Sequence, residues 1–272
     1  MREELVKGQF YEEERDDLTE QIKSCFLHGP GEVSGKKEVK KVYGVIAPHA
    51  GYLFSGQCQA HAYKEIFNSE EKILVIIGVN HRGTGNFIST EDWKTPLGVV
   101  NVDKEYANEI LKKCNFLKIN SEEHRHEHSI EVQLPFLQYV KKDFKIVPII
   151  LSDYSVYKEL AQVLDKGLVI ASSDFTHYGF SYGYVPFTKN IKDNMYKIDK
   201  KAISFILDLD AKGFLEFVKS NDMTICGYAA IATAIEVARL RGAKEGKLLE
   251  YYTSGDITNY NTAVGYGAIV FV

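Results

Sequence analysis

Three apolar runs of strand length, each followed within a few residues by a histidine, constrain this chain most. The runs are Val42–Ala47, Ile73–Gly78 and Leu168–Ala171, and the histidines that follow them are His49, His81 and His177. Val and Ile favour buried strands, and Pro48 ends the first run because it has no N–H to donate to a sheet ladder. In an open α/β sheet, ligands bind just beyond the carboxyl ends of the strands. We therefore expect these histidines at one edge of a sheet.

The rest of the chain alternates helix-like and strand-like segments. Helices are predicted at 14–25, 56–67, 104–114, 156–164, 190–207, 211–220 and 227–240, with another from about 129 that Pro135 should bend or restart. Further strands are predicted at 145–151, 248–253 and 263–272, a hairpin between 87 and 102, and a loop at Ser34–Lys37. This interleaving predicts an α/β fold, one domain over residues 1–272, with a mostly parallel central sheet, some antiparallel additions and flanking helices.

Composition argues against several classes of protein. The chain has 272 residues and a formal net charge of −4, which disfavours nucleic-acid binding through a general basic field. The longest apolar runs are strand-sized, so no membrane span is expected. The four cysteines form no CxxC pair, and the first residues lack the apolar core of a signal peptide. We expect a cytoplasmic protein in a reducing compartment.

The histidines and the aspartate at the strand ends also have purely structural interpretations. Either His49 or His81 can cap a helix or bond a backbone carbonyl, and for His49 alone that would be the favoured interpretation. His81 lies in the polar stretch Asn80–Gly83 directly after five apolar residues, an abrupt change for a simple turn. Asp174 and His177 share a face if the turn between them is helical, although Asp174 is also a good helix N-cap.

Cys226 comes at the start of the Ala-rich segment predicted as helix 227–240. A free cysteine is most often a small buried hydrophobic side chain. A helix N-terminus, however, lowers the pKa of a thiol and favours the thiolate that metals bind. Cys25, Cys58 and Cys114 lie at core-like positions of predicted helices, and we assign them no chemistry.

The densest group of histidines lies between Glu122 and Glu131. We interpret His124 and His126 as part of a solvated loop. His128 differs because it begins an apolar helical stretch, where it can point into a cleft as an acid–base group. The sequence holds no H-E-x-x-H pair, Walker loop, G-x-G-x-x-G after a strand or G-x-S-x-G, so zincin, nucleotide-binding and α/β-hydrolase functions have no support.

Jointly, His49 and His81 with one thiolate or carboxylate make a candidate mononuclear metal site. Two histidines and a carboxylate form the facial arrangement of non-haem iron oxygenases, which leaves positions open for substrate and dioxygen. With Cys226 in place of the carboxylate, the preference shifts toward softer ions such as copper(I) or zinc without excluding iron(II).

Six motifs resemble the Memo family. Its archaeal and bacterial members are called AmmeMemoRadiSam system protein B. The family is related to the class III extradiol (LigB-type) ring-cleaving dioxygenases. The matching stretches are Ala47–Gly56, Gly78–Gly83, Trp93–Gly98, Glu127–Pro135, Ser172–His177 and Cys226–Tyr228. The resemblance implies metal ligation by His49, His81 and Cys226. It also implies that Asp174, His177 and His128 line the same pocket. The implied fold is similar to that of the dioxygenases, with one central sheet and helices on both sides.

The chain departs from the dioxygenases at Cys226, where those relatives place a glutamate. A thiolate changes the charge and the metal preference of the site and is prone to oxidation, so catechol cleavage does not carry over directly. Animal Memo proteins are associated with phosphotyrosine peptides and with copper or iron redox chemistry. The name of the microbial subfamily suggests radical-SAM system proteins as partners.

The leading hypothesis is a mononuclear metal protein of oxidoreductase or dioxygenase-like type, with iron(II) or copper preferred to zinc and a small molecule or peptide as ligand. His177 or His128 would transfer protons, because an unperturbed imidazole titrates near neutrality, and Asp174 would orient a histidine.

Two other functions stay open at this point. The pocket would be a binding module if it recognised a (phospho)peptide or small anion without turnover. Its contacts would come from Arg82 and a Tyr-rich tail of Tyr251, Tyr252, Tyr260 and Tyr266. Bound zinc, with His177 or Asp174 as base for a metal-bound water, would instead make a hydrolase.

Overall fold

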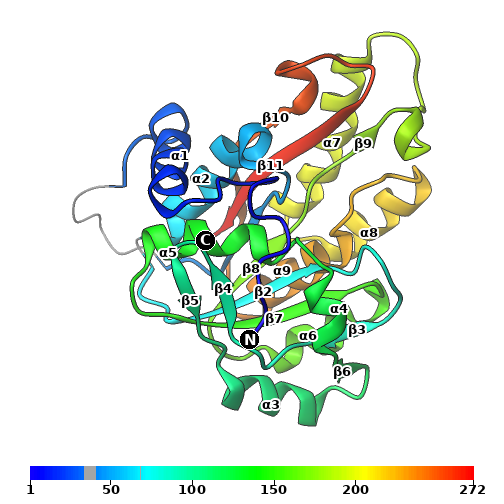
Figure 1. Ribbon diagram of the computed structural model, residues 1–272. Helices are drawn as coiled ribbons and strands as arrows, with labels where there is room; N and C mark the ends of the chain where they lie inside the picture. The colour runs from blue at the N-terminus through cyan, green and yellow to red at the C-terminus, as the bar shows by residue number, and fades with distance from the viewer. Residues whose placement is uncertain (34–40, 68) are drawn as a thin grey trace.

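Nine strands form one mixed sheet in the computed structural model, which describes residues 1–33, 41–67 and 69–272 (Figure 1). In spatial order the main strands are β10 (Gly246–Thr253), β11 (Ala263–Phe271), β1 (Gly44–Ala47), β8 (Leu168–Ser172), β2 (Ile73–Val79), β7 (Lys145–Leu151), β3 (Asn86–Ile88) and β6 (Leu117–Ile119). Short β9 (His177–Tyr178) pairs with β11. The central strands β1, β8, β2 and β7 are parallel, whereas β11 and β3 join this centre in antiparallel fashion. The predicted α/β fold is confirmed.

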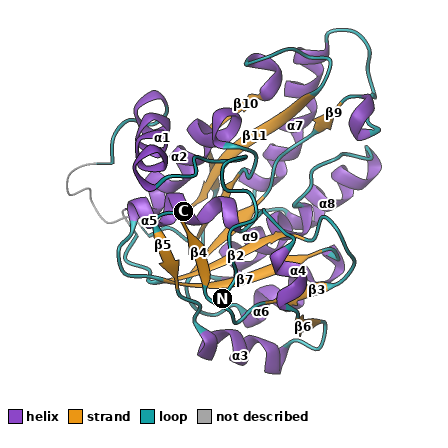
Figure 2. Cartoon of the chain, in the orientation of Figure 1, coloured by secondary structure: helices purple, strands orange, loops and turns teal. Residues whose placement is uncertain are grey.

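Helices cover both faces of the sheet (Figure 2). One face carries α1 (Arg15–His28), α2 (Tyr52–Phe67) and α5 (Leu134–Val140), and the other carries α3 (Lys104–Lys113), α6 (Tyr157–Val163), α7 (Ile191–Leu207), α8 (Ala211–Ser220) and α9 (Tyr228–Leu240). In β1, Val45 and Ala47 pack into the first of these cores and Ile46 into the second, because successive strand residues point to opposite faces. None of the helices among the described residues has the length and apolar composition that spanning a bilayer requires.

Local structure differs from the sequence prediction in two places. The helix predicted from about residue 129 is divided into a 3-10 turn at Glu131–Gln133 and α5, with Pro135 in the first turn of α5, where its missing N–H breaks no helical hydrogen bond. The predicted hairpin forms from β4 (Trp93–Thr95) and β5 (Gly98–Val100), but β3 belongs to the main sheet. The loop predicted at Ser34–Lys37 lies outside the described residues.

Residues 2–11 form an irregular strap, which we call the amino-terminal strap. It is the dark blue trace that runs from the label N toward α1 in Figure 1. Near its start, Arg2 forms a parallel bridge with Trp93. Near its end, the Phe10 carbonyl accepts a hydrogen bond of 2.7 Å from the backbone N–H of Tyr52, the first residue of α2. The strap is therefore fastened to the folded body at both ends.

Candidate metal centre

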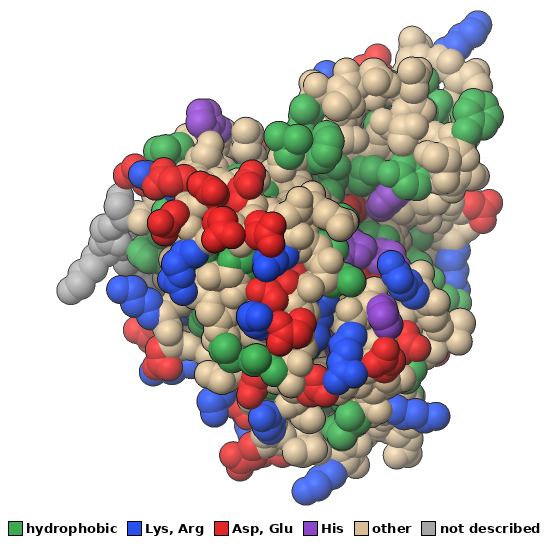
Figure 3. All heavy atoms as spheres, in the orientation of Figure 1, with side chains coloured by type: hydrophobic (Ala, Val, Ile, Leu, Met, Phe, Trp, Pro, Cys, Tyr) green, Lys and Arg blue, Asp and Glu red, His purple; other side chains and the backbone are tan. Residues whose placement is uncertain are grey.

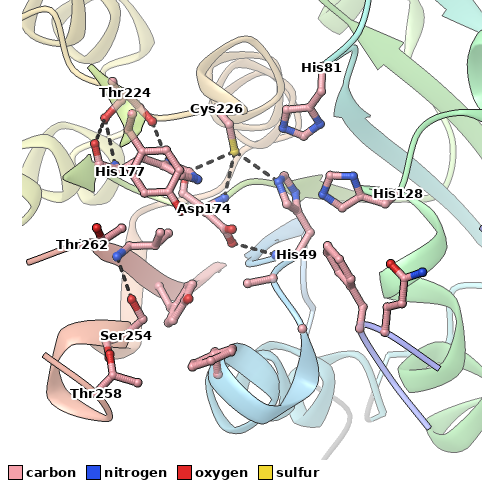
Figure 4. Close-up of a pocket in the computed structure, with 18 residues that line it drawn as sticks. His49, His81, His128, Asp174, His177, Thr224, Cys226, Ser254, Thr258 and Thr262 are labelled. Carbon is pink, nitrogen blue, oxygen red and sulfur yellow. Dashed lines mark hydrogen bonds between the residues drawn. The ribbon is translucent and has the colours of Figure 1, made fainter. Parts of the chain in front are cut away.

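The carboxyl ends of β1, β8 and β2 lie at one edge of the sheet, because these strands are parallel neighbours. His49 follows β1 and His81 follows β2, while Cys226 comes shortly before α9, which packs on β8 and β1. Figure 4 shows the three side chains gathered at one side of the cavity. One ligand atom from each lies within 4.8 Å of the others, and His49 Nε2 is 3.2 Å from Cys226 Sγ. The structure thus brings the three residues together, and their ligation of an ion stays a prediction.

The tautomer of His49 is set by buried hydrogen bonds. Its Nδ1 is 2.9 Å from Ser172 Oγ. That hydroxyl donates to the Ser129 carbonyl at 2.6 Å and accepts from Gln133 Nε2 at 2.8 Å, so it has no proton left for the imidazole. The same Gln133 nitrogen donates to the Pro48 carbonyl, which fixes the orientation of the amide. Nδ1 of His49 therefore carries the proton, and Nε2 presents its lone pair toward the sulfur.

Charge and burial keep the His49 ring neutral. Desolvation lowers its pKa well below the usual range, and the positive charges that His81 and His128 acquire on protonation lower it further. A neutral imidazole is the form that binds a metal.

His81 is oriented by a buried carboxylate. Both oxygens of Glu127 lie 3.1 Å from His81 Nδ1, and one of them also accepts from the His81 backbone N–H at 3.0 Å. Burial would raise the pKa of Glu127, but the hydrogen bonds from the ring and the main chain of His81 hold it far below its usual range. The ionised carboxylate accepts the Nδ1 proton, so His81 also presents Nε2 for coordination, as in many carboxylate-supported metal ligands.

The pKa of the Cys226 thiol is shifted in the direction opposite to the one predicted. Burial raises the pKa of the thiol, and the carboxylate of Asp174 raises it further. Desolvation by burial therefore sets the direction of the shift, which is opposite to the lowered pKa expected at a helix start. The backbone N–H of Asp174 donates to the sulfur at 3.3 Å, which offsets part of this effect. A coordinated cation would favour the thiolate of Cys226 over the thiol, since a metal-bound thiol is deprotonated outright.

His128 lies beside the other two imidazoles. Its ring stacks on His81 with centroids 4.9 Å apart and meets His49 edge-on at 5.4 Å. His81, Glu127 and His128 form a second group of ligand atoms within 4.8 Å of one another. Because the Glu127 oxygens already accept from His81 and from the Ser129 N–H, we interpret this group as support for His81. Burial lowers the pKa of His128 to about 4, so its ring is neutral near pH 7.

Asp174 and His177 reach the same site from the segment after β8. Asp174 Oδ1 accepts from the His49 backbone N–H at 2.8 Å, so this carboxylate positions the His49 main chain rather than its ring. His177 Nδ1 donates to the carbonyls of Phe175 and Thr224, each at 3.0 Å, which leaves Nε2 for the cavity. No helix forms between Asp174 and His177, so the condition for a shared helical face is not met, and Asp174 does not begin a helix.

The site opens into a cavity of about 730 Å³. Thr224 contributes a hydroxyl group beside His177, and the loop that joins β10 to β11 contributes others on the side away from His81 (Figure 4): Ser254, Thr258 and Thr262. The cavity also has apolar and aromatic lining: Phe10, Phe54, Tyr182, Val264 and Tyr266. No Lys or Arg lines it among the described residues. In Figure 3 purple histidine side chains lie in a cleft that green hydrophobic groups flank. The cavity therefore suits a ligand of low charge with an apolar part.

The interpretation of His124 as a solvated side chain is wrong. Its ring is fully buried and meets Trp93 edge-on at 5.9 Å, and burial lowers its pKa to about 3. The Arg2 guanidinium lies 4.3 Å from the centroid of the Trp93 ring and covers the same cluster. His126 is exposed as predicted, with a 2.9 Å contact to Glu122.

Sequence reasoning missed the residues behind the candidate ligands. Glu127 lies inside a histidine-rich motif, so a signal for it was present in the sequence. Ser172 and Gln133 gave none, because a polar residue in a buried segment does not reveal its partner. Phe10 reaches the cavity only because the amino-terminal strap folds back over the body.

Comparison with known proteins agrees with these features. A family profile described as Memo-like protein matches residues 2–270. This chain belongs to the Memo-like family. The resemblance inferred from the motifs is therefore confirmed at the level of the family.

Memo-like relatives match the chain over nearly its full length. A MEMO1 family protein of Methanopyrus kandleri is 39% identical over 289 residues, covering 99% of this chain and 98% of the relative. A MEMO1 family protein of Nitrosopumilus maritimus is 38% identical and covers 100% of both chains. Among solved structures, an uncharacterized protein from Escherichia coli K12 has a TM-score of 0.54 at 8% identity, covering 85% of this chain and 100% of that one. The last comparison shows a shared fold.

Proposed function

We propose that this protein holds one transition-metal ion on His49, His81 and Cys226 and acts as an oxidoreductase of dioxygenase-like type. The support is the convergence of two imidazole nitrogens and one sulfur, with both imidazole tautomers set by buried partners. Three protein ligands leave coordination positions for a substrate. An ion held there would supply Lewis-acid and redox chemistry to a molecule in the cavity.

Iron(II) and copper are the ions we propose ahead of zinc. The relation between the Memo family and extradiol dioxygenases favours iron(II), and the thiolate of Cys226 favours copper(I). The donor set is compatible with zinc as well, and elemental analysis distinguishes the three ions.

Proton transfer is assigned to His177. Its Nδ1–H is held by two carbonyls, so Nε2 is the nitrogen that can exchange a proton with a ligand in the cavity. His128 has a pKa of about 4 and is a weaker base at neutral pH. Asp174 helps to hold the His49 loop in place through its bond to the main chain.

The alternative of a non-catalytic module for a (phospho)peptide or small anion has less support. Phosphate groups are bound by Lys and Arg, and neither lines the cavity among the described residues. Arg82 is not part of its lining. Of the predicted tyrosine tail, only Tyr266 reaches the cavity, while the hydroxyls of Tyr251 and Tyr260 bond to Asp199 and Asp256.

The test is elemental analysis of protein purified anaerobically without chelator. Wild type should carry close to one equivalent of iron or copper, and His49→Ala, His81→Ala and Cys226→Ser should each lose most of it. His126→Ala, an exposed histidine outside the site, is the matched control and should keep its metal. Full metal retention in all three ligand variants would contradict the proposal. Bound zinc with hydrolytic turnover would favour the hydrolase, and iron- or copper-dependent oxygen consumption would exclude it.

A further inference from the structure

Arg2 is a buried cation far from solvent. Its side chain is 1% exposed. Nε donates to the His124 carbonyl at 3.0 Å and Nη2 donates to the Glu127 carbonyl at 2.8 Å. Nη1 forms an ion pair with Glu131, whose side chain is fully buried. One guanidinium therefore holds three points of the segment from His124 to Glu131.

Glu131 joins that segment to the strap. Besides Arg2, its carboxylate accepts from the backbone N–H groups of Leu5 and Val6 and from the Tyr11 hydroxyl at 2.6 Å. Desolvation, together with the charge of Glu131, raises the pKa of Tyr11, so this hydroxyl stays a donor. The amino-terminal strap and the segment 124–131 are thus one hydrogen-bonded unit.

The segment held by Arg2 also supplies the partners of the candidate metal ligands. Glu127 accepts the Nδ1 proton of His81. The Ser129 carbonyl accepts from the Ser172 hydroxyl, which in turn accepts the proton of His49 Nδ1. His128 contributes its ring to the cavity. A shift of this segment would move the supports of both imidazoles, and most directly that of His81.

We propose that Arg2 is a positioning residue of the metal centre. It holds the Glu127 main chain so that the Glu127 carboxylate keeps His81 in the Nδ1–H tautomer with Nε2 available to the ion. Groups that orient a metal ligand typically change metal affinity by about 10–100-fold when removed. This inference rests on the proposed metal site, and its experiments separate the two.

The first experiment titrates cobalt(II) into chelator-treated wild type, Arg2→Ala, His81→Ala and the double variant. Arg2→Ala should raise the Kd by about 10–100-fold. If Arg2 acts mainly through His81, Arg2→Ala should change the Kd much less in the His81→Ala background than in wild type, because the ligand it chiefly serves is gone. Arg125→Ala is the control, since this arginine lies in the same segment but pairs with Glu91 and Glu122 at the surface. An equal loss in both backgrounds would overturn the inference and indicate a general structural role.

The second experiment needs no metal. Nitrogen-15 NMR of the imidazoles in chelator-treated protein should show His81 as the Nδ1–H tautomer in wild type and as a mixture in Arg2→Ala. His177 should stay unchanged, because the Phe175 and Thr224 carbonyls that fix it do not touch Arg2. An unchanged His81, or an equal change in both rings, would overturn the inference even if the protein binds no metal. If Arg2→Ala does not fold, Arg2→Lys replaces it in this experiment. Lysine keeps the charge beside Glu131 but cannot reach all three acceptors. His81 should then show a mixture of tautomers with a smaller share of the second form than expected for Arg2→Ala.

Discussion

Ser172 Oγ and His49 Nδ1 are 2.9 Å apart, and the direction of the hydrogen bond between them decides which imidazole nitrogen faces the cavity. The serine proton is committed to the Ser129 carbonyl, so the histidine must donate. The buried Ser129 carbonyl, 80 residues along the chain from His49, therefore takes part in preparing a candidate metal ligand.

Ser172→Ala should weaken metal binding by about 10–100-fold, because His49 loses the acceptor that fixes its tautomer. It should also cost about 1–3 kcal/mol in free energy of unfolding, since the Ser129 carbonyl is left without its donor. Cobalt(II) titration and urea denaturation measure the two effects. Ser89→Ala is the matched control. Ser89 is also buried, but its hydroxyl accepts from the local Glu91 N–H, so the metal affinity of this variant should not change. Equal affinities for the two variants would contradict the role of Ser172.

Glu131→Ala should destabilise the protein by about 3–5 kcal/mol, because it leaves the buried Arg2 guanidinium without its counter-charge. Urea denaturation at pH 7 measures the change. Asp143→Ala removes the partner of Lys72 in an exposed ion pair, and solvent screening predicts little effect there. A Glu131 variant as stable as the Asp143 variant would show that the strap is not held by this pair.

Asp199 should make stability depend on pH in an unusual direction. Burial raises its pKa from 3.8 to about 6, although Thr176 and Tyr251 donate hydrogen bonds to it. The folded protein thus binds this proton more tightly than the unfolded chain. The stabilising contribution is complete below about pH 4 and is lost as the pH rises through about 6.

The corresponding measurement compares wild type with Asp199→Asn by urea denaturation between pH 4 and 7. The pKa change corresponds to about 3 kcal/mol, so wild type should lose about that much relative to the variant across this range. A difference between the two proteins that does not vary with pH would show that Asp199 titrates normally in the fold.

Gly227→Ala should disturb the sulfur ligand. A Cβ at this position would lie 2.5 Å from the Ser173 Cβ and 2.6 Å from the Ser172 carbonyl oxygen, so the backbone beside Cys226 must move. We expect at least a tenfold loss of metal affinity and a stability cost of about 1–3 kcal/mol. Gly51→Ala, whose new Cβ would lie 3.4 Å from its nearest neighbour, the Phe10 carbonyl oxygen, should be milder in both assays. The reverse order would mean that the position of Cys226 does not limit metal binding.

The convergence of His49 and His81 could be predicted because each follows a strand, and parallel strands deliver their ends to one edge. Cys226 was harder, since its place depends on how α9 packs, and the resemblance to Memo supplied it. The fold class followed from the alternation of apolar runs and amphipathic segments. Antiparallel additions were expected in general, but the pairing of β3 with β7 and the strand β9 were not, because three-residue and two-residue strands carry too little pattern.

What the sequence concealed was the layer behind the ligands. Arg2 and Glu131 are separated by 129 residues along the chain, and no local sequence pattern predicts a contact between residues so far apart. His124 is a second residue whose environment could not be predicted from the local sequence. Its neighbours are charged, so the stretch resembles a solvated loop, and only the covering Trp93 and Arg2 make it interior.

The last strand of the chain has a consequence for biosynthesis. β11 is inserted between β10 and β1, so the strand that leads to His49 keeps an open flank until β11 has been synthesised. Unpaired strand flanks are the points at which chains join one another and aggregate. Deletion of a few residues from β11 should therefore reduce the yield of intact protein more than a deletion of the same length in the β10–β11 loop.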